Sequence, residues 1–165
     1  MPVTYTPIAT TTLSSNASSY TFTSIPQTYT DLILIAVPLA TSNGQASFIR
    51  VGNGSIDSGS NYSMTALGGN GTSATSIRRT NATEYAVEYL PAADTTSKDI
   101  IMVHFMNYSN TSVYKTFLSR SGNASYGTDA TVGLWRNTAA INQISITSGA
   151  YATGSTFSLY GIASA

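Results

Sequence analysis

Hydrophobic and polar residues alternate over short stretches of this chain, a pattern that predicts β-strands rather than helices. No window keeps apolar residues at positions i, i+3, i+4 and i+7 for three turns, and Thr and Gly, both poor helix formers, occur throughout. Turn residues such as Asn43-Gly44 and Gly68-Gly69 separate the apolar stretches. The predicted strands are Val3–Leu13, Ser18–Ile25, Asp31–Leu39, Ala46–Val51, Tyr62–Leu67, Glu84–Leu90, Asp99–Tyr108, Val113–Ser121, Ala130–Arg136, Ile141–Thr147 and Ser155–Ile162.

The predicted strands are of two kinds. In Glu84–Tyr89 the glutamates Glu84 and Glu88 alternate with apolar residues, which predicts one wet face and one packed face. In contrast, Leu32–Val37 and Ile100–Val103 are apolar at every position. We expect these two to be central strands, covered on one face by a second sheet and on the other by a neighbouring subunit.

Two segments have no clear strand pattern of their own. Gly68–Thr83 is the longest polar stretch, and we expect a long loop that is exposed or ordered by a partner. Residues 1–12 carry no charge and contain Pro2 and Pro7, so they form either an extended arm on a neighbour or an edge strand, and we favour the edge strand. Because no composition break or fixed-period repeat divides the chain, we predict a single all-β domain over residues 1–165, an antiparallel β-sandwich.

Composition sharpens this prediction. Hydrophobic residues make up 42% of the chain, enough for a packed core and too many for a disordered protein. Charged residues make up only 8%, against roughly 25% in an average protein, and seven basic residues balance seven acidic ones. We therefore expect a neutral surface of Ser, Thr, Asn and Gly, which excludes an electrostatically driven nucleic-acid binder.

Sequence features also exclude several sites and locations. There is no cysteine, so disulfides, thiolate chemistry and cysteine-based zinc sites are excluded. The most apolar run, Leu32–Ala40, is about half the length of a membrane-spanning helix and contains Pro38, so we expect no membrane partner. The N-terminal residues lack the basic and apolar regions of a secretory signal.

Catalytic residues are scarce. His104 is the only histidine, no Gly-x-Ser-x-Gly elbow presents a nucleophile, and we expect a strand histidine with a hydrogen-bonded ring. Glu84 and Glu88 would lie about 13 Å apart along a strand, whereas glycosidase carboxylates need roughly 5 to 9.5 Å. A distant acid could still meet one of them in space. We predict that the protein is not an enzyme.

Metal and cofactor signals are also weak. Asn53–Gly59 loosely resembles a calcium-binding loop, but it offers a single carboxylate and its glycine is misplaced for an EF-hand, so we interpret it as a turn. The glycines at 68, 69 and 71 are not followed by a lysine or a helix, as a phosphate-binding loop would be. We predict no metal and no cofactor.

A few residues are candidates for contacts with a partner. Arg78-Arg79 is the only adjacent basic pair, and it either makes ion pairs across an interface or is simply solvated. The tyrosines at positions 62, 85, 89, 108, 114, 126 and 151, together with Trp135, could line a sugar-binding surface, but we favour core and interface positions for them.

Three segments together resemble a known family. They are Phe22–Leu32, which leads into an apolar strand, Asp57–Tyr62, and Gly133–Ile144, which is closed by Ala152–Ile162. In this order they resemble small β-rich structural proteins of tailed bacteriophages, which occur as capsid decoration or cement proteins, while similar modules end longer tail or head fibres. The resemblance spans about Tyr20 to Ile162, and the closing segment is its most specific part.

The resemblance implies a jelly-roll-like β-sandwich that assembles as a homotrimer on the virion surface. We expect a non-enzymatic capsid decoration protein that binds the major capsid protein, with Arg78, Arg79, Trp135 and Arg136 as the candidate partner-contact residues. The alternative is a fibre tip in which residues 68–83 and exposed tyrosines meet a host receptor or glycan. A glycan hydrolase on the same surface is the third possibility.

Overall fold

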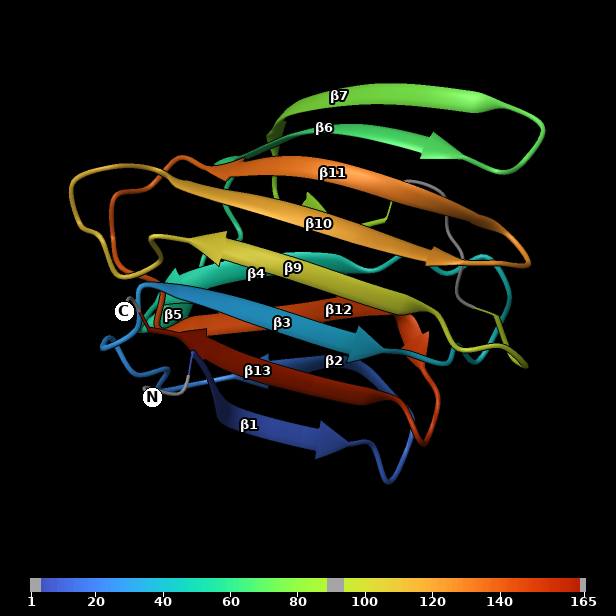
Figure 1. Ribbon diagram of the computed structural model, residues 1–165, viewed down its shortest axis with the longest axis horizontal. Coiled ribbons are helices and arrows are strands. Elements are labelled where there is room, and N and C mark those ends of the chain that lie inside the picture. The colour runs from blue at the N-terminus through green and yellow to red at the C-terminus, as the bar shows by residue number, and fades with distance from the viewer. Residues whose placement is uncertain (1–3, 89–93, 164–165) are drawn as a thin grey trace.

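The computed structural model describes residues 4–88 and 94–163, and within them every regular element is a β-strand. The strands are β1 (Tyr5–Thr12), β2 (Ala17–Phe22), β3 (Asp31–Val37), β4 (Phe48–Asn53), β5 (Ser55–Ile56), β6 (Tyr62–Gly69), β7 (Ala74–Ala82), β8 (Tyr85–Ala86), β9 (Ile100–Met106), β10 (Lys115–Asn123), β11 (Gly127–Trp135), β12 (Gln143–Tyr151) and β13 (Thr156–Ile162). They form two antiparallel sheets packed together, which confirms the predicted β-sandwich (Figure 1). The jelly-roll connectivity stays a prediction.

The larger sheet has eight strands in the order β1-β13-β3-β9-β10-β11-β6-β7, visible from bottom to top in Figure 1. The two strands that are apolar at nearly every position, β3 and β9, are third and fourth in this order, with neighbours on both sides. Leu34 on β3 lies opposite Leu159 on β13 and Val103 on β9. The prediction that these are central strands is therefore confirmed, and their cover by a neighbouring subunit stays a prediction.

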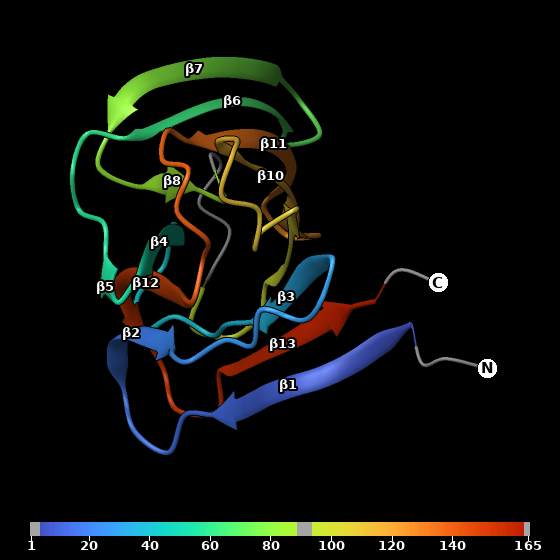
Figure 2. The ribbon, with the colours of Figure 1, turned by 90° about the vertical axis from the view of Figure 1, so that its left-hand side faces the viewer.

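The smaller sheet has five strands, in the order β2-β12-β4-β5 with β8 paired to β4. Seen from the side, the larger sheet curves around it from β7 to β1 (Figure 2). Alternate residues of the two sheets fill the space between the layers, among them Ile49 and Ile144 from the smaller sheet and Phe105 and Phe117 from the larger, all 0% exposed. The rings of Phe105 and Phe117 pack edge to face with centroids 5.1 Å apart.

The polar segment 68–83, predicted to be a loop, is instead a hairpin formed by the end of β6 and by β7. At its tip the Asn70 Oδ1 accepts hydrogen bonds from the backbone N–H of Thr72 and Ser73, at 3.0 and 2.8 Å, and Gly71 has φ of +87°. The loop prediction was wrong because β7 is an edge strand that buries little side-chain surface. Its ladder of backbone hydrogen bonds to β6 does not require an apolar sequence.

The segment predicted as the strand Glu84–Leu90 also differs. Only β8 is a strand, and all four residues 85–88 are buried because β8, paired with β4 in the smaller sheet, also packs against β6 and β11 of the larger sheet. Glu88 is 1% exposed and its Oε2 accepts the backbone N–H of Ser47 at 2.7 Å. The predicted wet face carrying Glu84 and Glu88 is therefore wrong for Glu88, and residues 89 and 90 lie outside the described residues.

The N-terminal segment forms the other edge of the larger sheet. Residues 5–12 are strand β1, which pairs antiparallel with β13 from Tyr5 opposite Ile162 to Thr12 opposite Thr156. This is the edge-strand alternative for the segment, and residues 1–3 of the predicted arm lie outside the described residues.

Candidate functional site

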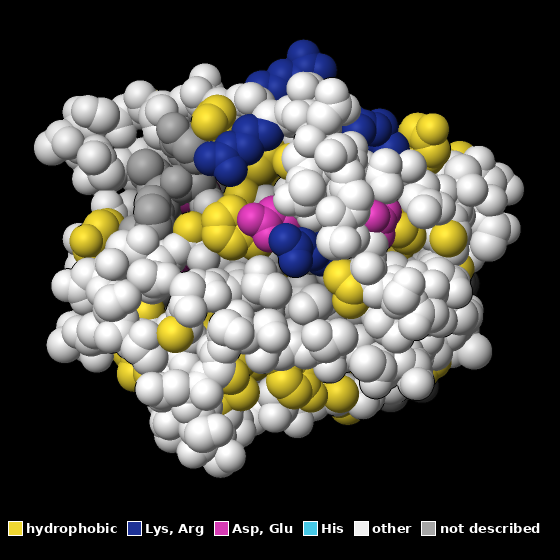
Figure 3. All heavy atoms as spheres, turned by 180° about the vertical axis from the view of Figure 1, so that it is seen from behind, with side chains coloured by type: hydrophobic (Ala, Val, Ile, Leu, Met, Phe, Trp, Pro, Cys, Tyr) yellow, Lys and Arg dark blue, Asp and Glu magenta, His cyan; other side chains and the backbone are white. Residues whose placement is uncertain are grey.

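The outer faces of the two sheets have different chemistry. On the smaller sheet, the outward positions of neighbouring strands carry hydroxyl groups, and Thr21 Oγ1 donates a hydrogen bond to Ser145 Oγ at 3.0 Å. Figure 3 views the molecule from this side and shows a mostly neutral polar surface, with its charged side chains gathered in the upper part. This is the surface that the composition predicted.

The outer face of the larger sheet is apolar instead. Leu118, Val132 and Leu67 stand on the adjacent strands β10, β11 and β6, and they are 44%, 46% and 63% exposed. Leu118 lies directly opposite Val132, and the neighbouring position Ala130 lies opposite Leu67. Ile100, at the start of β9, is 56% exposed. We call the surface formed by Leu67, Ile100, Leu118 and Val132 the apolar outer face.

A hollow of about 650 Å³ lies at one end of this face. Ile100 and Met102 give it apolar lining, and the turns around Gly71 and Tyr126 form part of its wall. Arg120 also lines it, with its Nη2 3.6 Å from the Met102 sulfur. The outer-face hollow can therefore accept an apolar side chain beside a positive charge.

The predicted contact residues Arg78 and Arg79 both lie exposed on β7, but they face opposite ways. Arg78 is opposite Thr65, an outward position, whereas Arg79 is opposite the buried Met64. Since successive strand residues point to opposite sides, only Arg78 belongs to the side of the apolar outer face. The two arginines thus do not form one basic patch on a single face.

Trp135, the third predicted contact residue, lies beneath the surface. It is 1% exposed, and its indole Nε1 donates to Asp57 Oδ2 at 2.7 Å. Asp57 also accepts the side-chain amide of Asn61 and the backbone N–H of Gly59, each at 2.8 Å. Burial opposes ionisation of this carboxyl, but these three hydrogen bonds outweigh it and hold the pKa of Asp57 below its usual value.

Arg136, the fourth predicted contact residue, fastens the β6–β7 hairpin to the segment that follows β11. Its Nη1 donates to Ser63 Oγ at 2.8 Å, and its Nη2 donates to the Ser60 carbonyl at 2.5 Å and to Asn81 Oδ1 at 2.8 Å. The structure therefore brings Arg136 against the hairpin that carries Arg78 and Arg79, and it leaves Trp135 as a support below the surface.

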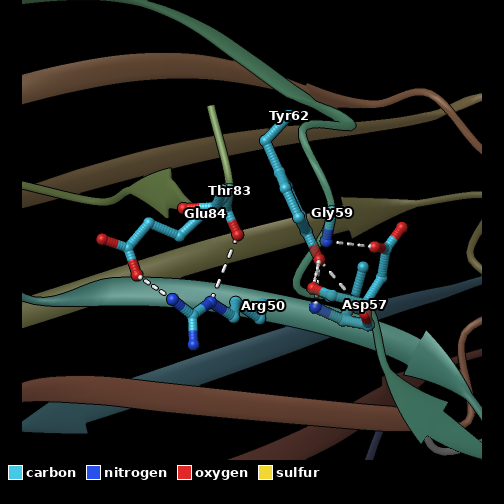
Figure 4. A network of polar contacts seen from close by, with 7 residues as sticks. Arg50, Asp57, Gly59, Tyr62, Thr83 and Glu84 are labelled. Carbon is cyan, nitrogen blue, oxygen red and sulfur yellow. Dashed lines mark hydrogen bonds and ion pairs between the residues drawn. The ribbon is translucent and has the colours of Figure 1, made fainter. Parts of the chain in front are cut away.

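The polar network around Asp57 is shown in Figure 4. The Tyr62 hydroxyl donates to the Asp57 carbonyl at 2.9 Å and accepts the Val51 N–H at 3.0 Å, and burial raises the pKa of Tyr62. Beside it, Arg50 bonds Glu84 at 3.1 Å and the Thr83 carbonyl at 3.2 Å. Each of these groups bonds another part of the chain, so the network holds strands together rather than offering free groups to a ligand.

A second hollow, of about 490 Å³, adjoins this network. Its polar lining is similarly occupied. The Asn53 amide donates to the Ala140 carbonyl at 2.8 Å, and the Asn137 Oδ1 accepts the Ala139 N–H at 2.9 Å. The loop that resembled a calcium site supplies a single carboxylate to this hollow, and both oxygens of Asp57 are already bonded.

The residues considered for catalysis are likewise tied to structural partners. His104 Nε2 lies 2.9 Å from Asp31 Oδ2, and the other oxygen of Asp31 accepts the Asn107 N–H at 2.7 Å, which confirms the predicted strand histidine with a bonded ring. Glu84 pairs with Arg50 and Glu88 with the backbone of Ser47. In residues 4–88 and 94–163, no three His, Cys, Asp or Glu side chains gather as a metal site.

The tyrosines divide between core and surface. Tyr62, Tyr85, Tyr108 and Tyr151 are buried, at 0 to 1% exposed, as the core interpretation predicted, while Tyr89 lies outside the described residues. Tyr114 and Tyr126 are exposed, but they precede and follow the nine-residue strand β10, a separation of roughly 30 Å. They do not form a shared platform for a sugar ring.

The sequence analysis did not predict the apolar outer face, although the sequence contains one indication of it. Phe117-Leu118 puts large apolar residues at successive positions of a strand, so one of them must face outward. Val132, between Thr131 and Gly133, gave no such indication. The face becomes visible only when the sheet order places β10, β11 and β6 side by side.

No family model and no curated sequence matches this chain. Across the described part of the chain, none of the elements is a helix of the length and apolarity that crossing a membrane requires. The feature of the molecule that points to a function is its surface, above all the contrast between the two outer faces.

Proposed function

We propose that this chain is a non-enzymatic structural protein of a tailed bacteriophage virion, and that it binds the outer capsid surface as a decoration protein. The observation that carries the proposal is the apolar outer face, on which Leu67, Leu118 and Val132 stand 44% to 63% exposed on adjacent strands. Contiguous exposed apolar side chains are typical of a surface that another protein covers. The resemblance of three sequence segments to phage decoration proteins supports the identity of that partner.

The proposed mechanism is mechanical. Copies of the protein, expected to be homotrimers, bind symmetry-related sites formed by the major capsid protein and bridge neighbouring capsomers. Because binding occurs only to the assembled shell, each occupied site stabilises the closed shell over open or dissociated forms by mass action. No reaction is needed for this role.

The arrangement of titratable groups favours binding over catalysis. The Asp31–His104 pair joins β3 to β9, and the Arg50–Glu84 pair joins β4 to the turn between β7 and β8. Asp57 supports Trp135 through a 2.7 Å hydrogen bond. These groups hold the sandwich together and leave a surface whose main property is its shape and apolar character.

The test is the copy number of this protein in purified phage particles, measured by quantitative mass spectrometry against the major capsid protein. A count in the hundreds, matching the number of equivalent capsid sites, supports decoration. A count of a few trimers per particle would contradict decoration and favour the alternative, a fibre tip. Absence from the particle would reject both.

The alternative fibre tip would bind a host receptor or glycan through residues 68–83 and exposed tyrosines. Residues 68–83 form a regular hairpin, and Tyr114 and Tyr126 lie at opposite ends of β10. No particular contact surface for a glycan is assembled from them, so decoration is the function that we put forward.

A further inference from the structure

The chain has no formal net charge, yet its acidic and basic side chains are distributed differently between interior and surface. The seven acids are Asp31, Asp57, Glu84, Glu88, Asp94, Asp99 and Asp129. Four of them, Glu88, Asp94, Asp99 and Asp129, are at most 8% exposed. The other three are half-buried and bonded within the chain: Asp31 to His104, Asp57 to Trp135 and Glu84 to Arg50. No acid is fully exposed.

The basic residues are mostly on the surface. Arg78, Arg79, Lys98 and Arg120 are exposed, whereas Lys115 is 1% exposed and donates to backbone carbonyls. The exposed charges of the surface are therefore mostly positive, whereas the outer face of the smaller sheet has the neutral character that the composition predicted. Counts of residues could not show this, because the acids that cancel the charge are inside the fold.

Two of the exposed cations flank the apolar outer face. Arg120 on β10 lies opposite Ala130, which lies opposite Leu67, and so Arg120 points to the same side as these residues. Arg78 on β7 lies opposite Thr65, which lies opposite Val132. Val132 on β11 and Leu67 on β6 thus stand between a cation on β10 and another on the edge strand β7.

The acid nearest along this side of the sheet is Asp31. Leu118 on β10 lies opposite His104 on β9, and Asp31 is on β3, the next strand of the sheet. The Asp31 carboxylate already bonds His104 and Asn107. Its side chain is 24% exposed. The charges available on this side of the molecule are therefore positive.

We infer that the apolar outer face docks onto an acidic protein surface, which places carboxylates against Arg78 and Arg120 and an apolar side chain in the outer-face hollow. This inference rests on the proposed function and specifies the chemistry of the capsid surface that would be bound. A second copy of this chain does not fit, because all seven of its acidic side chains are buried or half-buried. A nucleic acid would satisfy the arginines but leave the leucines and valine uncovered.

The first test titrates the isotope-labelled full chain with a short synthetic peptide that alternates glutamate with leucine, and follows backbone amide shifts by NMR. A peptide alternating lysine with leucine and a random-sequence DNA duplex are the comparisons. The acidic peptide should shift amides of β6, β10 and β11 with the greatest affinity. Tighter binding of the DNA, or concentration-dependent shifts of this face in the chain alone, would overturn the inference.

Matched variants locate the charges. Arg78→Glu and Arg120→Glu should each weaken binding of the acidic peptide about fivefold or more, because each variant loses a favourable charge at the rim of the interface and gains a repulsive one. Arg79→Glu makes the same charge change one residue away on the opposite side of β7, and it should weaken binding less than about twofold. Equal losses for Arg78→Glu and Arg79→Glu would show that only net charge matters and would reject the surface.

The same variants in phage particles separate the two proposals. Reduced occupancy with Arg78→Glu and Arg120→Glu, but not with Arg79→Glu, supports both. A normal copy number in the hundreds with all three variants would leave decoration intact and reject this docking surface. Binding of the acidic peptide by a protein absent from particles would reject decoration and keep the surface.

Discussion

Gly133 occupies a position on β11 where only a hydrogen atom fits beneath an aromatic ring. A Cβ built there would lie 2.3 Å from Cε2 of Tyr85, far inside van der Waals contact. Tyr85 cannot retreat easily, because its hydroxyl bonds Ser119 Oγ at 2.7 Å and the Thr131 carbonyl at 2.9 Å. The glycine is therefore required by packing rather than by backbone conformation.

Gly133→Ala should destabilise the fold by about 2 kcal/mol, as overpacking of a closed core does. Gly69→Ala is the control, since a Cβ there meets its nearest atom only at 3.8 Å. Chemical denaturation of both variants measures the difference. Equal stability of the two would mean that Tyr85 moves aside without cost.

A buried carboxyl should give the fold a pH dependence opposite to the usual one. Burial raises the pKa of Asp99 to about 6, and the nearby charge of Asp129 adds to this, although the Ile100 and Gly122 N–H groups oppose it. In the unfolded chain Asp99 has a pKa near 3.8. Between that pH and about 6, the folded protein therefore keeps a proton on Asp99 that the unfolded chain has already released. This contribution to stability is complete below pH 3.8 and declines as the pH rises through about 6.

Asp99→Asn should remove that decline. Relative to the variant, the wild type should lose about 2 to 3 kcal/mol of unfolding free energy between pH 4 and pH 7, from a pKa difference of about two units. Denaturation curves at a series of pH values measure this difference, and the contributions of other groups cancel in the comparison. A constant difference across the range would contradict the raised pKa of Asp99.

At the scale of elements, the sequence predicts those strands whose side chains are buried, because burial requires apolar residues at particular positions. β3 and β9 were predictable because strands covered by their neighbours require apolar residues at successive positions. β7 was not, because an edge strand held by backbone hydrogen bonds leaves no hydrophobic pattern. The bond between Trp135 and Asp57 joins residues 78 positions apart, which no local pattern can reveal.

The loop between β5 and β6 depends on that long-range bond. Asp57→Ala would remove an acceptor from the buried Trp135 indole and two hydrogen bonds within the loop, and it should cost about 2 kcal/mol. Because Trp135 is the only tryptophan, its fluorescence reports the change directly. We expect emission shifted to longer wavelength as water reaches the ring.

Ser58→Ala, an exposed change in the same loop, is the control and should leave both stability and emission as in the wild type. Asp57→Asn retains one acceptor oxygen and should fall between the two. If Asp57→Ala leaves the emission unchanged, the carboxylate does not hold the indole in place.

At the scale of the whole molecule, a homotrimer that also docks on a capsid needs two contact surfaces on each β-sandwich, one for the other copies and one for the capsid. Three copies meeting through the apolar outer face would bring Arg78 and Arg120 of each chain together, and none of the acidic side chains is exposed to compensate them. Repulsion among unpaired charges in a desolvated interface disfavours that arrangement. We therefore expect trimer contacts to lie elsewhere.

Leu118→Asp tests this arrangement because it puts a charge in the middle of the apolar outer face, at a position 44% exposed and so tolerant of a polar residue. Light scattering should still give three times the 17.3 kDa of one chain, while occupancy on phage particles should fall sharply. Leu118→Ala, which keeps the face apolar, should retain both properties in larger part. A Leu118→Asp protein that is folded but monomeric would instead make this face the trimer interface, and the capsid would then have to be bound through the hydroxyl-rich face of the smaller sheet.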